Sequence, residues 1–107
     1  MSGRSGRLSV IVPSLNEADV IRPLLQALQP LRGSGHELIL ADGGSTDDTV
    51  SIAEPMVDHL VITQPGRAIQ MNAGARMAVG DIFWFLHADS RFTAELPEQL
   101  ISYKEIY

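Results

Sequence analysis

Four short apolar runs alternate along the chain with stretches in which apolar residues recur at helical spacing. The runs cover residues 8–12, 37–41, 59–63 and 82–86 and are rich in β-branched and aromatic residues, which favour strands. Strands that alternate with helices call for a parallel sheet with right-handed crossovers. The pattern therefore predicts an α/β fold, an open parallel sheet with helices on both faces. We expect the strand order 3-2-1-4.

The first helix is predicted from an apolar stripe that follows the first strand. The stripe consists of Ile21, Leu24, Leu25 and Leu28. Asn16 is suited to cap this helix, and residues 33–35 should end it. Pro23 lies too far inside the helix to be harmless, so we expect a kink or a late helix start there. Pro13 should close the preceding strand.

Two further helices are predicted from capping patterns. Ser45 and Asp48 resemble a capping box for a short second helix that ends at about Glu54. The third helix should begin near Arg67, and Gly80 is well placed as its C-terminal cap. The inner stripe expected for this helix consists of Ala68, Met71, Ala75 and Ala78.

The fourth strand carries the sequence I-F-W-F-L-H-A-D from residue 82. Its unbroken apolar run suits a central strand that is buried on both faces and ends at a site. Side chains alternate along a strand, so His87 and Asp89 should point the same way. They are either two ligands or an ordinary turn. Polar clusters also follow the first two strands, at 13–17 and 42–45, and ligands bind at such carboxyl ends beside a topological switch point.

Composition and charge narrow the function classes. The net charge of −5 leaves no basic patch for nucleic acid, and the lack of cysteine excludes disulfides and thiolate metal sites. The apolar run at 8–12 is too short for a signal peptide, and none approaches the roughly 18 residues of a membrane span. We therefore expect a cytoplasmic protein with a flexible tail at residues 1–7 and one domain at 8–107.

Several candidate residues have a structural interpretation beside the functional one. Asn16 and Ser45 are either helix caps alone or part of a site, and Asp42 before two glycines is either a turn residue or a ligand. A cation at a helix start has the wrong sign for the dipole, which favours a ligand role for Arg67. Asn72 lies on a face that should pack, so it needs backbone or ligand partners. We interpret His36 and His59 as exposed residues and Trp84 as core.

Four segments resemble a known family: S-V-I-V-P-S-L-N-E, A-D-G-G-S-T-D-D-T, P-G-R-A-I-Q-M-N-A-G-A and F-L-H-A-D. In this order and spacing they resemble family 2 glycosyltransferases, which have the GT-A fold. The resemblance covers about residues 8–91. The last two segments are most similar to a bacterial subgroup of radical-SAM/selenodomain-associated transferases. The chain thus resembles the N-terminal, Rossmann-like half of a GT-A fold, which binds the nucleotide.

The resemblance implies roles for individual residues. Asp42 would accept a hydrogen bond from the base, and Asp89 would bind a divalent Mn²⁺ or Mg²⁺ that bridges the diphosphate of the donor. Nucleotide-binding roles are implied for Pro13, Ser14, Asn16, Glu17, Asp42, Arg67, Asn72, His87 and Ala88. His87 stands where the family has the first Asp of D-x-D, and an imidazole shifts the preference towards Mn²⁺.

A second departure concerns the acceptor. The family has its acceptor-binding half and its general base beyond the D-x-D segment, whereas this chain continues only to Tyr107. After residue 91 it carries one short amphipathic stretch, whose apolar face consists of Leu96, Leu100 and Tyr103. We therefore expect a truncated chain, a GT-A half domain without the acceptor half, which is inactive in transfer by itself.

The leading functional prediction is the donor-binding domain of an inverting glycosyltransferase that binds a nucleotide-diphosphate sugar and a divalent metal. The alternatives are a non-catalytic nucleotide-binding module and, ranked lower, a nucleotidyltransferase, for which a Gly-rich loop with a Lys is missing. In the order 3-2-1-4, residues 82–86 form an apolar edge strand, so we expect self-association there or through the amphipathic stretch. The donor base, the sugar and the acceptor are not specified by these residues.

Overall fold

The protein is represented by a computed structural model that describes residues 6–86. Four parallel strands form one sheet in the order β3-β2-β1-β4, which confirms the predicted α/β class and strand order. The elements in chain order are β1 (Leu8–Ser14), α1 (Ala18–Gly33), β2 (Glu37–Asp42), α2 (Thr49–Ala53), the 3-10 helix η1 (Glu54–Met56), β3 (His59–Ile62), α3 (Arg67–Met77) and β4 (Ile82–Phe85).

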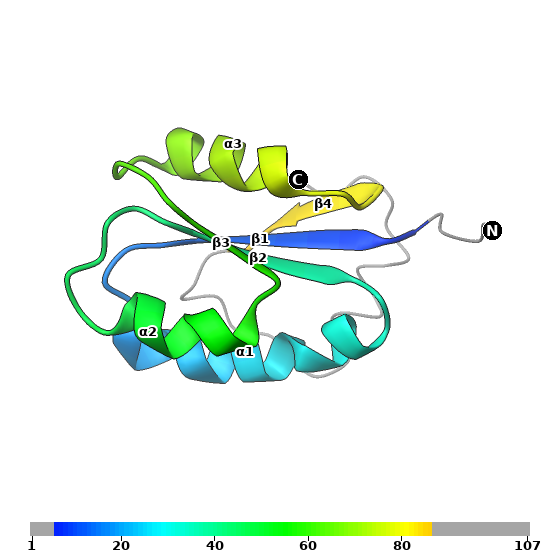
Figure 1. The fold of residues 1–107 in the computed structure, drawn as a ribbon, viewed down its shortest axis with the longest axis horizontal. Coiled ribbons are helices and arrows are strands. Elements are labelled where there is room, and N and C mark those ends of the chain that lie inside the picture. The colour runs from blue at the N-terminus through cyan, green and yellow to red at the C-terminus, as the bar shows by residue number, and fades with distance from the viewer. Residues whose placement is uncertain (1–5, 87–107) are drawn as a thin grey trace.

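The sheet lies between two helical layers. Helices α1 and α2 cover one face and α3 covers the other, as Figure 1 shows. The predicted stripe of α1 is buried, together with Leu31, against the side of β1 that carries Val10 and Val12. All seven residues of β1 are buried, because this strand has a neighbour on each side and a helix on each face. Trp84 belongs to the same core, as predicted.

The borders of two strands differ from the sequence prediction. Pro13 does not close β1, which continues to Ser14 while Pro13 faces Ala41 of β2. Strand β4 pairs with β1 at an edge of the described sheet, and Phe83 and Phe85 are only partly buried. The prediction of a central strand buried on both faces is therefore wrong for the described residues, whereas the predicted edge position is confirmed.

Helix α1 begins at Ala18, without a side-chain cap. The N-cap residue is Glu17, not Asn16, and its side chain makes no capping hydrogen bond. Pro23 lies inside the helix, so the expected late start is wrong. The predicted capping box of α2 is also wrong, because its N-cap is Asp48 and Ser45 bonds elsewhere. No helix within residues 6–86 has the length and apolar character to cross a membrane.

Helix α3 packs on the sheet with a face other than the predicted one. Its buried residues are Gln70 and Gly74, and the expected stripe lies to either side of them. A Cβ atom at residue 74 would lie 2.4 Å from Cγ2 of Ile11, so only glycine permits this close approach of α3 to β1. The helix ends at Met77, so Gly80 is not its cap; Gly80 instead packs closely against Ser9 of β1.

A buried polar network ties the connection between α3 and β4 to the amino ends of β1 and β2. The carboxylate of Glu37, which is 2% exposed, accepts hydrogen bonds from Ser9 Oγ and from the backbone N–H of Val79. Ser9 Oγ in turn accepts from Gly80 N at 2.8 Å. His59 Nε2 lies 3.6 Å from Glu37. This network stabilises the fold at the end of the sheet opposite to the polar clusters.

The side chain of His36 packs at the start of β1 rather than extending into solvent. It is half-buried, and its Nδ1 accepts a hydrogen bond from the backbone N–H of Leu8 at 2.8 Å. Burial lowers the pKa of His36 below its ordinary value, and the positive charge of Arg7 lowers this pKa further. The interpretation of His36 as an exposed residue is therefore wrong.

Candidate functional site

The carboxyl ends of β1 and β2 are joined through the buried side chain of Asp42. This carboxylate is 0% exposed, and its Oδ1 accepts hydrogen bonds from Ser14 Oγ at 2.8 Å and Ser45 Oγ at 2.6 Å. Its Oδ2 accepts from the backbone N–H groups of Gly44 at 3.0 Å and Ser45 at 2.6 Å. Four donors use the acceptor sites that a carboxylate offers. Asp42 therefore fixes the loop after β2 on the end of β1.

Asn16 connects the same two loops from the other side. It has a φ of 53°, a left-handed conformation that asparagine tolerates better than most residues. Its side-chain Oδ1 accepts from the backbone N–H of Thr46 at 2.8 Å, while its own N–H donates to Ser45 Oγ at 2.8 Å. Asn16 and Ser45 thus bond to each other's loops rather than cap their own helices.

The loop after β2 and the first residue of α2 also supply acceptors for the start of α1. The backbone N–H of Glu17 donates to Thr49 Oγ1 at 2.8 Å, and that of Ala18 donates to Asp47 at 3.2 Å. Asp47 further accepts from the N–H and hydroxyl of Thr49, and the hydroxyl bond is the main reason that the pKa of Asp47 is lowered. These bonds satisfy N–H groups that a helix start leaves without intrahelical partners.

Gln70 joins three segments beneath the site, and the sequence interpretation missed it. The residue is 5% exposed, and its Nε2 donates to the carbonyl oxygens of Ser14 at 2.9 Å and Ala41 at 2.8 Å. Its Oε1 accepts from the backbone N–H of Gly66 at 3.1 Å. The sequence did offer a signal for this role: Gln70 is a polar residue four positions after Gly66, the glycine that precedes the helix. The assignment of the packed face of α3 to the alanines and Met71 concealed it.

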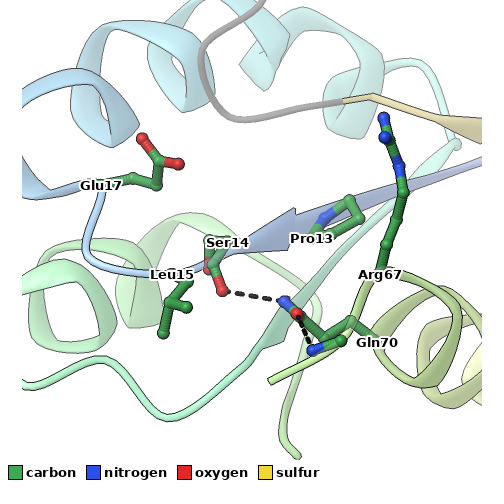
Figure 2. Close-up of a pocket in the computed structure, with 7 residues that line it drawn as sticks. Pro13, Ser14, Leu15, Glu17, Arg67 and Gln70 are labelled. Atoms are coloured by element: carbon green, nitrogen blue, oxygen red, sulfur yellow. Dashed lines mark hydrogen bonds between the residues drawn. The ribbon is translucent and has the colours of Figure 1, made fainter. Parts of the chain in front are cut away.

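These elements surround a cleft of about 300 Å³ at the carboxyl edge of the sheet. The lining residues are Pro13, Ser14, Leu15, Glu17, Gly66, Arg67 and Gln70. In Figure 2, Pro13 and Ser14 lie between Glu17 on one flank and the extended side chain of Arg67 on the other. An acidic residue at the start of α1 and a basic residue at the start of α3 thus line the same cleft. The volume is at the lower end of the range for small-molecule sites, about 300 Å³ and upwards.

The cleft brings together four of the predicted nucleotide-binding residues: Pro13, Ser14, Glu17 and Arg67. Asn16 and Asp42 support it from neighbouring positions without lining it. Asn72 is exposed on α3, so the expectation that it lies on the packed face is wrong. The three remaining predicted site residues, His87, Ala88 and Asp89, lie outside the described residues, as do Leu96, Leu100 and Tyr103.

The described part of the cleft does not by itself match a divalent-metal site. Within residues 6–86 no three histidine, aspartate or glutamate side chains come together in a group that could hold a metal ion. Among the described residues, Glu17 is the one carboxylate residue that lines the cleft. A hard divalent cation usually takes several oxygen ligands, including waters and substrate oxygens. Asp89, the predicted ligand, lies outside the described residues.

Comparison with known proteins identifies relatives among glycosyltransferases. The chain is 38% identical over 88 residues to a PGL/p-HBAD biosynthesis glycosyltransferase of Mycobacterium tuberculosis, covering 76% of this chain and 34% of the relative. It is 30% identical over 108 residues to the uncharacterized glycosyltransferase YibD of Escherichia coli, covering 95% of this chain and 31% of YibD. The chain thus spans about a third of the length of these relatives.

Solved structures agree with this relationship. Glucosyl-3-phosphoglycerate synthase from M. tuberculosis, in complex with Mn²⁺, UDP and glucosyl-3-phosphoglycerate, superposes with a TM-score of 0.80 at 28% identity. The aligned region covers 94% of this chain and 39% of the synthase. The UDP complex of the same enzyme gives a TM-score of 0.81. The four-stranded parallel sheet is therefore the sheet of a GT-A glycosyltransferase.

The family comparison covers nearly the whole sequence. The family described as Glycosyl transferase family 2 matches residues 9–105, which include β1, both loops of the cleft, α3 and β4. The matched region thus contains every described residue that lines the cleft. This match, together with the relatives and the fold, shows that the chain belongs to glycosyltransferase family 2.

Proposed function

We propose that the cleft binds the nucleoside diphosphate part of a sugar donor, and that the chain is the donor-binding region of a glycosyltransferase. The observation that carries this proposal is the position of Arg67, the first residue of α3, whose side chain lines the cleft and extends past Pro13 of β1. A diphosphate is a dianion at least, and a chain of net charge −5 attracts it only through local cations and N–H groups. The related synthase binds UDP in a chain with the same fold.

The described contacts give the predicted residues two kinds of role. Pro13, Ser14, Glu17 and Arg67 line the cleft and are proposed to contact the donor. Asp42 and Asn16 are proposed to act indirectly, because their side-chain acceptors already bond to protein donors. Contacts of Asn72, His87 and Ala88 with the nucleotide stay predictions.

A divalent cation is proposed to assist donor binding through Asp89. The support is the D-x-D-like segment in the sequence and the Mn²⁺ in the complex of the related synthase. The described residues supply no complete site, so the proposal assigns them no metal contact. If it is correct, UDP should bind more tightly with MnCl₂ than with EDTA, and Asp89→Ala should remove the difference.

The finer features of the proposal rest on the sequence resemblance. We propose inverting transfer for the whole protein, and donor binding without transfer for these 107 residues, because the resemblance places the acceptor base beyond the D-x-D segment. Membership of the radical-SAM/selenodomain-associated subgroup and a cytoplasmic location also remain predictions from the sequence. Sugar transfer from UDP-glucose by the 107-residue chain would contradict the second point.

The central experiment is titration calorimetry with UDP, UDP-glucose and GDP in the presence of MnCl₂. We expect at least one nucleotide to bind the unmodified chain, and Arg67→Ala to weaken it by about tenfold or more through loss of a charge-assisted contact. Arg76→Ala is the matched control, since Arg76 is an exposed arginine in the last turn of the same helix. No binding of any nucleotide, or equal losses for both variants, would refute the proposal.

Self-association is proposed for the edge of the sheet. Within the described residues, β4 pairs with β1 along one side, and its partly buried Phe83 and Phe85 are large apolar residues. Exposed apolar edge strands favour pairing with another chain. Sedimentation at high micromolar concentration should therefore reveal a dimer or a larger species, and a monodisperse monomer would contradict this.

A further inference from the structure

We infer that Gln70 is a positioning residue for donor binding, which holds the two walls of the cleft at their working separation. One wall is the end of β1 with Ser14, and the other is the start of α3 with Arg67. The Gln70 amide is the described side chain that bonds to both walls, at Ser14 O and at Gly66 N. This inference rests on the proposed function and names the residue that prepares the site.

The hydrogen bonds of Gln70 use the specific capacity of an amide. Both N–H groups of Nε2 are engaged by carbonyl oxygens of neighbouring strands, Ser14 of β1 and Ala41 of β2, while Oε1 accepts from Gly66. These carbonyls stand where the strands end and are buried with the amide. A group that donates twice and accepts once is needed here, and an amide is the side chain of this size that does so.

The bond to Gly66 transmits the position of the strands to Arg67. Gly66 precedes Arg67 directly and has a φ of 152°, a conformation that side chains rarely adopt. Its N–H is held by the Gln70 side chain, while its carbonyl accepts the first helical bond from the Gln70 backbone. Gln70 therefore holds both the N–H and the carbonyl of Gly66. Because Gly66 directly precedes Arg67, these bonds also set the direction of the Arg67 side chain.

Gly43 provides the space in which this amide lies. A Cβ atom at residue 43 would lie 2.9 Å from Gln70 Oε1 and 3.1 Å from the Cα of Pro65. Steric space therefore requires glycine at residue 43, independently of the geometry of the turn. A side chain at residue 43 and the amide of Gln70 exclude each other in this arrangement.

The test measures UDP affinity, in MnCl₂, of Gln70→Leu and Gln70→Glu, two variants of similar size. Leu removes all three bonds, whereas Glu keeps an acceptor for Gly66 but turns an oxygen towards two carbonyls. We expect both to weaken UDP binding by about tenfold or more, because a misplaced binding group loses preorganisation. Circular dichroism and thermal unfolding identify the temperature range in which each variant is folded.

Gln29→Leu is the matched control for lost hydrogen bonds. Gln29 Nε2 also donates to two backbone carbonyls, those of Leu25 and Met56, each at 2.9 Å, and its Oε1 accepts from Arg32. It belongs to α1 and does not line the cleft. We expect Gln29→Leu to change UDP affinity by less than about twofold even where it lowers the unfolding temperature, since its hydrogen-bond partners Leu25, Arg32 and Met56 do not line the cleft.

A double-mutant cycle separates positioning from general stabilisation. If Gln70 acts through Arg67, then Arg67→Ala costs clearly less affinity in the Gln70→Leu background than in the unmodified chain. Additive losses, or unmodified affinity in Gln70→Leu and Gln70→Glu, would overturn the inference. Absence of UDP binding by the unmodified chain would instead overturn the proposed function itself and this inference with it.

Discussion

The side-chain oxygen of Asn16 accepts a hydrogen bond from the backbone N–H of Thr46 at 2.8 Å, across 30 positions of the chain. Because Asn16 also has a φ of 53°, two separable features of one residue hold the loops together. Alanine at residue 16 has no side-chain acceptor and tolerates a positive φ poorly. Asn16→Ala should therefore lower the free energy of unfolding by about 2 kcal/mol. Urea denaturation at neutral pH measures this.

Two further variants at this position assign the loss. Asn16→Gly accepts the backbone conformation but has no acceptor, so we expect about half of the effect of alanine, roughly 1 kcal/mol. Asn16→Asp retains an oxygen for Thr46 and tolerance of positive φ, and should remain close to the unmodified protein. A loss in Asn16→Asp as large as in Asn16→Ala would show that another contact of the amide dominates.

Asp42→Asn tests the buried carboxylate that accepts four hydrogen bonds. The substitution turns an N–H₂ group towards Ser14 and Ser45 or towards the backbone N–H groups of residues 44 and 45, all of which are donors. We expect the free energy of unfolding to fall by about 2–3 kcal/mol, because buried groups that donate hydrogen bonds to the carboxylate would lose their acceptor. Asp81→Asn, at an exposed aspartate, should be nearly neutral in the same urea experiment.

The half-buried His36 makes stability depend on pH. Its pKa in the folded state lies below the ordinary value of 6.5, chiefly because of burial and then because of Arg7. The unfolded chain therefore binds the proton first, and the stabilisation, complete above pH 6.5, is lost as the pH falls towards the folded-state pKa. A protonated Nδ1 would also oppose the N–H of Leu8.

The measurement is urea denaturation at several pH values between neutral and mildly acidic. His36→Gln, whose side-chain oxygen offers an acceptor that does not titrate, should lose less stability than the unmodified protein over this interval. His59→Gln serves as a control that leaves the His36 contribution in place. Identical pH profiles for His36→Gln and the unmodified protein would contradict the assignment.

Gly74→Ala tests the close approach of α3 to β1. Alanine is the better helix former, yet its Cβ would lie 2.4 Å from Cγ2 of Ile11, so α3 or β1 must shift. We expect a loss of about 1–3 kcal/mol, as for other overpacked sites. Gly33→Ala in α1 is the control: nothing lies within 4 Å of its Cβ position, so helix propensity should make it neutral or stabilising.

The sequence specified the sheet because its strands are apolar, short and separated by helical patterns, and burial permits few other arrangements. It did not specify the face of α3. Alanine and glycine occur on several sides of this helix, so steric fit of Gly74 against Ile11 decides the rotation, and that contact joins residues 63 positions apart.

The sequence predicted which polar residues lie near the site, but not which groups they bond to. Asn16, Asp42 and Ser45 are polar and lie at or just after strand ends, where ligands bind. Their hydrogen bonds, however, go to backbone N–H groups and hydroxyls of the neighbouring loop, which only the fold brings near. Gln70 escaped notice for the same reason, since its partners Ser14 and Ala41 belong to strands 56 and 29 positions away.

The register of the sheet also bears on the order in which the chain folds. Ser9 pairs with Glu37 and Ile39 with His59, whereas Leu8 must wait for Ile82, 74 positions later. Loop-closure entropy makes this last pairing the costly long-range step. We expect the segment from β1 to β3 to assemble first, during synthesis or refolding, and α3 to dock when β4 reaches β1. The cleft would then be among the last features of residues 6–86 to form.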